Sequence, residues 1–206
     1  MISEGQFEEI KRFLPQFLSA EAQRDLFRSI LQFPDNLNSR MYSPALLRET
    51  EFLQGDGVKS MPFVLLPRTD FGRQPAIILS NSCDLSLDNS RLLDLRVNYA
   101  PIHKLEKYEN LLRNQKPRDS NRIASHLAAI RRQEVSHLFY LPDGPGGPGY
   151  EGLVRLDTIQ NASLGELSTN RIPQDRLFTF SNYGQYLFLV KLSIHLTRIR
   201  DGVDRH

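Results

Sequence analysis

The chain has 206 residues, of which 40% are apolar and 24% charged, and its formal net charge is +2. This length allows one domain with its own core, and the near-neutral balance does not by itself require a nucleic-acid partner. A single cysteine excludes an internal disulfide and is typical of a reducing compartment. The first residues lack a signal-peptide pattern, and no run approaches the roughly 20 apolar residues of a membrane span. We therefore expect a cytoplasmic protein with no membrane partner.

Two helices are predicted at the N-terminus, where apolar residues recur at helical spacing over residues 4–33. Pro15 interrupts this spacing and predicts a break. Ser19 has the side chain of an N-cap for the second helix, which ends before Pro34. We expect residues 1–43 to form a helical hairpin packed on the core. Residues 44–206 would form the main domain, as one structural unit with this hairpin.

The rest of the chain mixes strands and helices. Short apolar stretches bounded by turn-forming residues predict strands at 61–66, 76–80, 92–97, 138–141, 153–159 and 176–181. Helical spacing returns at 103–113 and 120–136, and an apolar helix buried against the sheet is predicted from residue 182 to about 199. The connection 143–149, rich in glycine and proline, is expected to be a mobile surface loop. This order predicts the α+β class, with a small, strongly bent sheet or barrel at its centre.

One part of the chain has the order of segments of a known family. Gly55-Asp56-Gly57-Val58 precedes a predicted strand, a loop at 68–73 follows, and then comes Gln74-Pro75 with four apolar residues and Ser80-Asn81. A later strand ends in Asn98-Tyr99-Ala100-Pro101-Ile102. This order resembles the PemK/MazF family of prokaryotic toxin ribonucleases. The resemblance covers residues 55–102 and implies an SH3-like barrel, with a role in a toxin–antitoxin or defence setting.

The chain departs from this family at a residue that catalysis requires. The resemblance implies a catalytic arginine before the proline, and this position holds Gln74. Arg73 is adjacent, but successive residues of a strand face opposite sides of the sheet, so we do not expect it to substitute. The triplet Ser82-Cys83-Asp84 is also absent from the family's pattern. The resemblance therefore implies a fold more than a ribonuclease activity.

A small polar cluster follows the predicted strand at 76–80. The candidate catalytic residues are Cys83 and Asp84, and the candidate pocket residues are Gln74, Ser80, Asn81 and Ser82. A nucleophilic thiolate needs a nearby histidine, cation or helix N-terminus, and the sequence brings no histidine close. We favour a small buried Cys83 beside a turn built by Asp84, with chemistry as the alternative. No Cys-x2-Cys or His-x3-His spacing is present, so we expect no metal and no cofactor.

A basic stretch occupies residues 113–132, with six cationic side chains against Asp119 alone and a net charge of +5. The candidate nucleic-acid contacts are Arg113, Lys116, Arg118, Arg122, Arg131 and Arg132, together with Arg73 in the loop before the central strand. The planar fork of arginine donates two hydrogen bonds to one phosphate. The alternative is a solvated helix face, because no aromatic residues interleave to stack bases.

Three functions follow from these observations. The leading hypothesis is a prokaryotic or phage nucleic-acid-associated protein of toxin–antitoxin or defence type, which binds RNA or DNA and lacks the standard ribonuclease arginine. The second is a non-enzymatic regulatory or interaction subunit that binds a protein partner or a second copy of itself. The third is a cysteine-dependent hydrolase centred on Cys83.

Overall fold

The computed structural model describes residues 18–68, 70–86, 93–115, 120–167, 172 and 174–197. The helices are α2 (Ala20–Leu31), α3 (Leu37–Arg40), α4 (Leu105–Asn114), α5 (Ser120–Arg131) and α6 (Asn182–Thr197). The strands are β1 (Gly57–Leu65), β2 (Asp70–Ile78), β3 (Arg96–Lys104), β4 (Leu138–Leu141), β5 (Gly152–Arg155), β6 (Gln160–Ser163) and β7 (Arg176–Phe178). Short 3-10 turns are η2 (Pro44–Leu46), η3 (Ser82–Asp84) and η4 (Leu164–Glu166). The first helix of the predicted N-terminal hairpin falls outside the described residues, and the second is α2.

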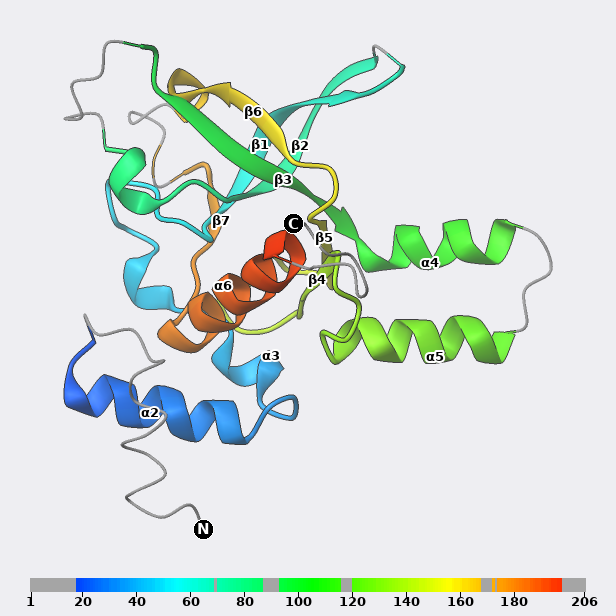
Figure 1. The fold of residues 1–206 in the computed structure, drawn as a ribbon, viewed down its shortest axis with the longest axis horizontal. Coiled ribbons are helices and arrows are strands. Elements are labelled where there is room, and N and C mark those ends of the chain that lie inside the picture. The colour runs from blue at the N-terminus through cyan, green and yellow to red at the C-terminus, as the bar shows by residue number, and fades with distance from the viewer. Residues whose placement is uncertain are drawn as a thin grey trace, which may run out of the picture.

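The strands form one antiparallel sheet in the order β4-β5-β3-β2-β1-β7, with β6 paired to β3 beside this path. Helices before, between and after these strands confirm the α+β class. The order ends at β4 and β7, so the described strands make an open sheet. Of the two predicted forms, a bent sheet or a barrel, the closed barrel is not observed: β3 leaves β6 to pair with β5 and leads into α4 (Figure 1).

The central strand β3 changes its neighbour halfway along its length. Arg96–Tyr99 pair with β6 and Ile102–Lys104 pair with β5, so Pro101 falls between the two ladders. Proline lacks the N–H that a ladder requires, and this gap is a position in a central strand where it is tolerated. The strand predicted at 92–97 is displaced towards the C-terminus, since β3 begins at Arg96 and continues through Pro101 to Lys104.

The end of β2 is buried on both faces, which explains its unbroken apolar run. Ile77 packs into the cluster formed with α2, α6 and β7, where Phe178 and Phe188 are fully buried. Ala76 and Ile78 face the other side and pack with Met61 and residues near η4. The predicted C-terminal helix is α6, and it lies between the sheet and α2 (Figure 1).

The helices α4 and α5 form a hairpin that projects from the end of the sheet (Figure 1). Leu105, Ile123 and Ile130 bury its inner side against β4 and β5. Both helices agree with the predictions at 103–113 and 120–136. The second ends early, at Arg131, and Gln133 follows with a φ of 61° in the left-handed region.

The connection 143–149 is packed against its surroundings rather than loose. A Cβ on Gly144 would lie 2.1 Å from the Asn38 carbonyl oxygen, and one on Gly147 would lie 2.5 Å from Tyr42. The Tyr42 hydroxyl also donates to the Pro142 carbonyl at 2.8 Å. The glycines therefore permit close packing on α3, where the sequence predicted only turn formation and mobility.

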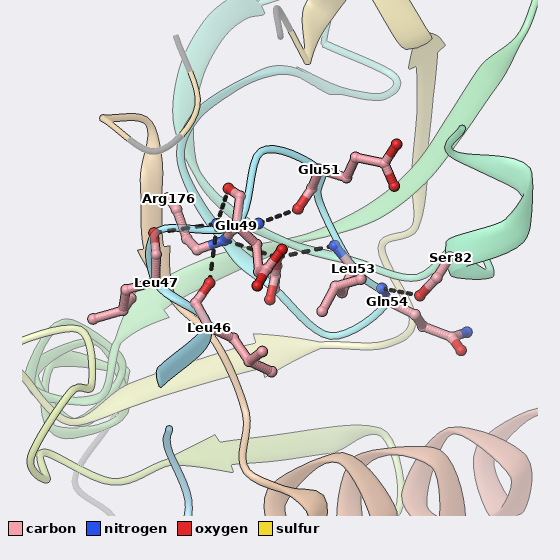
Figure 2. A network of polar contacts seen from close by, with 9 residues as sticks. Leu46, Leu47, Glu49, Glu51, Leu53, Gln54, Ser82 and Arg176 are labelled. Carbon is pink, nitrogen blue, oxygen red and sulfur yellow. Dashed lines mark hydrogen bonds and ion pairs between the residues drawn. The ribbon is translucent and has the colours of Figure 1, made fainter. Parts of the chain in front are cut away.

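A buried arginine in β7 organises the segment that leads into β1 (Figure 2). Arg176 donates from Nε to Asp56 at 2.9 Å, and both side chains are at most 1% exposed. Its other nitrogens donate to main-chain carbonyls of residues 46, 47, 49 and 51. Asp56 also accepts from the Leu53 N–H at 2.9 Å. Burial raises the pKa of Asp56, and the Leu53 N–H, Thr179 and Arg176 oppose this shift.

We predict that Arg176→Met destabilises the protein by about 3–5 kcal/mol, because it leaves Asp56 and the loop carbonyls buried without donors. The matched control is Arg73→Met, which removes an ion pair to Glu166 between side chains that are 43% and 37% exposed. We expect this control to cost less than about 1 kcal/mol. Urea unfolding of both variants measures the difference, and equal losses would contradict the role given to Arg176.

A second buried cation lies on α6. Lys191 is 6% exposed, and its Nζ donates to the main-chain carbonyl of Gln133, just after α5. Burial lowers the pKa of Lys191 to about 8. The contact ties α6 to the base of the α4–α5 hairpin at the cost of burying a charge.

The stability of the protein should therefore rise between pH 7 and pH 9.5, relative to that of Lys191→Met. The folded state releases the proton near its pKa of about 8, whereas the unfolded chain keeps it up to the ordinary lysine pKa of 10.5. The expected gain over this range is about 1–2 kcal/mol in urea unfolding. A Lys107→Met variant on α4 is the control, and its stability should change with pH as that of the wild type does. The prediction is refuted if the unfolding free energies of the wild type and Lys191→Met change with pH in parallel.

Candidate nucleic-acid interface

The polar cluster after β2 is a network that fixes the chain path. The Asn98 N–H donates to Ser80 Oγ at 2.8 Å, and the Gln54 N–H donates to Ser82 Oγ at 3.0 Å. Asn81 accepts from the Cys83 N–H at 2.9 Å and caps η3, the role that the sequence assigned to Asp84. Figure 2 shows that this cluster joins the Arg176 network through Leu53 and Gln54. The turn-building interpretation is thus supported, with Asn81 as the capping residue.

The only cysteine lies at the surface rather than in the core. Cys83 is exposed on η3, so the favoured prediction of a buried side chain is wrong. The chain leaves the sheet at Ser80 and turns outward there, which the sequence did not reveal. A thiolate nucleophile would need a nearby base, and one described histidine, His103, lies on β3. It is five strand residues, or about 17 Å, from Asn98, the residue that contacts Ser80. Its pKa is lowered by burial, with Arg155 adding to the shift.

Of the predicted pocket residues, Gln74 lies apart from Ser80, Asn81 and Ser82. Gln74 pairs with Met61 in the middle of the β1–β2 ladder, whereas Ser80 lies beyond the end of β2. Four strand residues from Gln74 to Ile78 already span about 13 Å. The Gln74 Nε2 is buried without a hydrogen-bond partner among the described residues. Neither of the two clefts discussed below is lined by the cluster at 80–84.

Arg73 is held to the sheet by its own neighbours. Its Nε donates to Ser60 Oγ at 3.0 Å, and its Nη1 forms the ion pair with Glu166 at 3.0 Å. This places the guanidinium across β1 and η4, so Arg73 lies in β2 and not in a loop as predicted. A phosphate would have to displace Glu166 to bind there.

The arginines of the basic stretch lie at the two ends of the α4–α5 hairpin, its base next to the sheet and its projecting end. At the base, Arg131 binds Glu151 in a bidentate pair of 2.7 and 2.8 Å, and Tyr140 donates to the same carboxylate at 2.6 Å. Hydrogen bonds from Arg131 lower the pKa of Glu151. Arg132 likewise pairs with Glu134 at 2.7 Å. These two arginines already have the anionic partners that a nucleic acid would otherwise supply.

The projecting end of the hairpin is different. Arg113 lies in the last turn of α4 and pairs with Glu109 one turn back, and Arg122 lies in the first turn of α5. Lys116 and Arg118 fall in the connection between the two helices, outside the described residues. In the part of the chain that the structure describes, Arg122 forms no ion pair with a carboxylate. Among the described arginines, the hairpin end therefore holds one outside an ion pair, whereas both arginines at the base are paired.

A cleft lies between the two helices near this end. Tyr108, Leu112, Arg122, Ile123 and His126 line it, and its volume is about 490 Å³. A second cleft, of about 430 Å³, lies where Arg40 and Tyr42 meet the N-terminus of α6. Its Arg40 forms an ion pair with Asp25, and Ser181 caps the helix by accepting from the Gly184 N–H. The first cleft alone combines a cation outside any described ion pair with aromatic side chains.

Sequence reasoning missed Tyr108 and His126 as neighbours. They are 18 residues apart, and their hydrogen bond of 2.9 Å forms only because α4 and α5 are antiparallel. The separate helical patterns at 103–113 and 120–136, joined by a short connection, were the signal that could have placed them on facing sides.

Comparison with known proteins gives this chain no family. No known family model matches it, and no curated protein matches it in sequence. None of the helices within the described ranges is long and apolar enough to cross a membrane.

Proposed function

We propose that this protein binds RNA or DNA through the projecting end of the α4–α5 hairpin, in a toxin–antitoxin or defence setting. The resemblance over residues 55–102 supports the setting and an SH3-like origin for β1 to β3. The departure at Gln74 supports a binding role without the family's ribonuclease arginine.

The observation that carries the proposal is the unequal pairing of the arginines. Residues 113–122 hold four cations and one anion, and the hairpin end projects away from the sheet (Figure 1). Cations close together in the chain favour binding to a nucleic-acid backbone, because neutralising the phosphates releases their counterions. The surface pair of Arg113 with Glu109 is 49% and 28% exposed, so its exchange for a phosphate costs little.

We predict that Arg122→Glu weakens binding to a fluorescent single-stranded RNA or DNA by about tenfold at low salt, and lowers the salt slope by about one. The matched control is Arg132→Glu at the other end of α5, which makes the same charge change. We expect the control to have a much smaller effect in the same anisotropy titration. Wild-type protein that shows no salt-dependent binding would refute the proposed function, and equal effects would refute the hairpin end as its site.

A second candidate function is self-association through the tip of the β1–β2 hairpin. Leu65, Leu66 and Phe71 are 44%, 76% and 70% exposed around this turn. Apolar side chains gathered at a projecting tip favour a protein contact. The long antiparallel ladder between β1 and β2 gives the tip a rigid support.

We expect the wild-type protein to form a dimer at micromolar concentration in light scattering, with reductant present, and Phe71→Ser to shift it to monomer. Leu93→Ser is the control, because Leu93 is 83% exposed but lies away from this tip. A wild-type monomer at every concentration, or a dimer that Phe71→Ser leaves intact, would contradict the second candidate.

A further inference from the structure

The cleft between α4 and α5 has a wall that is prepared for a flat ligand. Tyr108 Oη and His126 Nε2 lie 2.9 Å apart, and their ring centroids are 5.9 Å apart at an interplanar angle of 47°. Each ring therefore restricts the rotation of the other before any ligand arrives. Preorganisation of this kind lowers the entropic cost of binding.

The other walls of the cleft are apolar. Leu112 is half-buried on α4, and Ile123 is 5% exposed on α5. Together with Tyr108 they offer carbon surface on both helices, and His126 adds an imidazole ring that is hydrogen-bonded to Tyr108. An aromatic heterocycle with polar edges matches this lining better than an aliphatic chain does.

Arg122 completes the cleft with a positive charge. It is exposed at the start of α5 and lines the same cavity as the two rings. The other three described arginines of the basic stretch bind Glu109, Glu151 and Glu134. Within the described ranges Arg122 has no such partner, so its planar fork is available for two parallel hydrogen bonds to a phosphate.

We propose that this cleft binds one nucleoside monophosphate unit, with the base against Tyr108 and the phosphate at Arg122. The volume of about 490 Å³ lies within the range of roughly 300–1,000 Å³ that small-ligand sites occupy. The unit comes either from a free mononucleotide or from an unpaired nucleotide of a bound strand. The strand source rests on the proposed function, and the free mononucleotide does not.

The test compares three small probes by isothermal titration: adenosine monophosphate, adenosine and inorganic phosphate. We expect the monophosphate to bind more tightly than either fragment. Tyr108→Leu should weaken it by about tenfold, since stacking of one base on an aromatic ring contributes a factor of this size. Tyr108→Phe, which keeps the ring and loses only the hydroxyl, should retain most of the affinity. Arg122→Gln should weaken the monophosphate and leave adenosine unchanged.

A parallel anisotropy titration distinguishes the two sources. A labelled single strand that loses affinity in Tyr108→Leu, while a duplex of the same sequence does not, supports the strand source. RNA and DNA versions of the strand show which sugar is accepted. Monophosphate binding without any strand binding supports the free source, and it refutes the proposed function while leaving this inference in place.

Two outcomes overturn the inference. In the first, inorganic phosphate binds as tightly as the monophosphate, so the base contributes nothing. In the second, Tyr108→Leu and Tyr108→Phe behave like the wild type towards every probe, although urea unfolding shows both variants to be folded. If the second outcome holds but strand binding still depends on Arg122, the proposed function stands and only the nucleotide site in the cleft is refuted.

Discussion

The buried contact between Arg176 and Asp56 is the constraint on which the rest of the structure depends. One guanidinium neutralises a carboxylate and donates to the carbonyls of a segment that has no ladder of its own. It thereby fixes residues 46–56 against β7 and sets where β1 begins. Because Leu53 and Gln54 extend the network to Ser82, the turn at the end of β2 is fixed by the same contact (Figure 2). A buried charge pair is costly to desolvate, and here its extra hydrogen bonds offset that cost.

The residues fixed by this contact belong to the body of the protein, from which the α4–α5 hairpin projects as an arm (Figure 1). The predicted pocket residues Ser80, Asn81 and Ser82 belong to this body, since their side-chain oxygens accept hydrogen bonds from main-chain N–H groups. The arm is the α4–α5 hairpin, which has its own small core and is tied to α6 by Lys191. The candidate ligand site lies on this arm, where Arg122 and the rings of Tyr108 and His126 line one cleft.

The sequence predicted the local elements better than their assembly. Helical spacing found α2, α4, α5 and α6, and the apolar run at Ala76–Leu79 found the buried half of β2. The strand β3 was misplaced because Pro101 counts against a central strand, and no local pattern reveals that it lies where pairing with β6 gives way to pairing with β5. The ion pairs of Arg131 and Arg132 were invisible in the charge count, since Glu151 and Glu134 fall outside the basic stretch. Burial of Arg176 and Lys191 was likewise hidden, because both residue types are mostly exposed.

The exposed position of Cys83 has a consequence for disulfide bonds between molecules of the protein. A chain with a single thiol cannot form a disulfide within itself, so any disulfide joins it to a second thiol-bearing molecule, and this thiol is exposed on η3. Under oxidising conditions the protein therefore carries the means to link two copies covalently, at a place unrelated to the β1–β2 tip. The same thiol gives one defined attachment point for a spectroscopic label on the body of the protein, outside the helical arm.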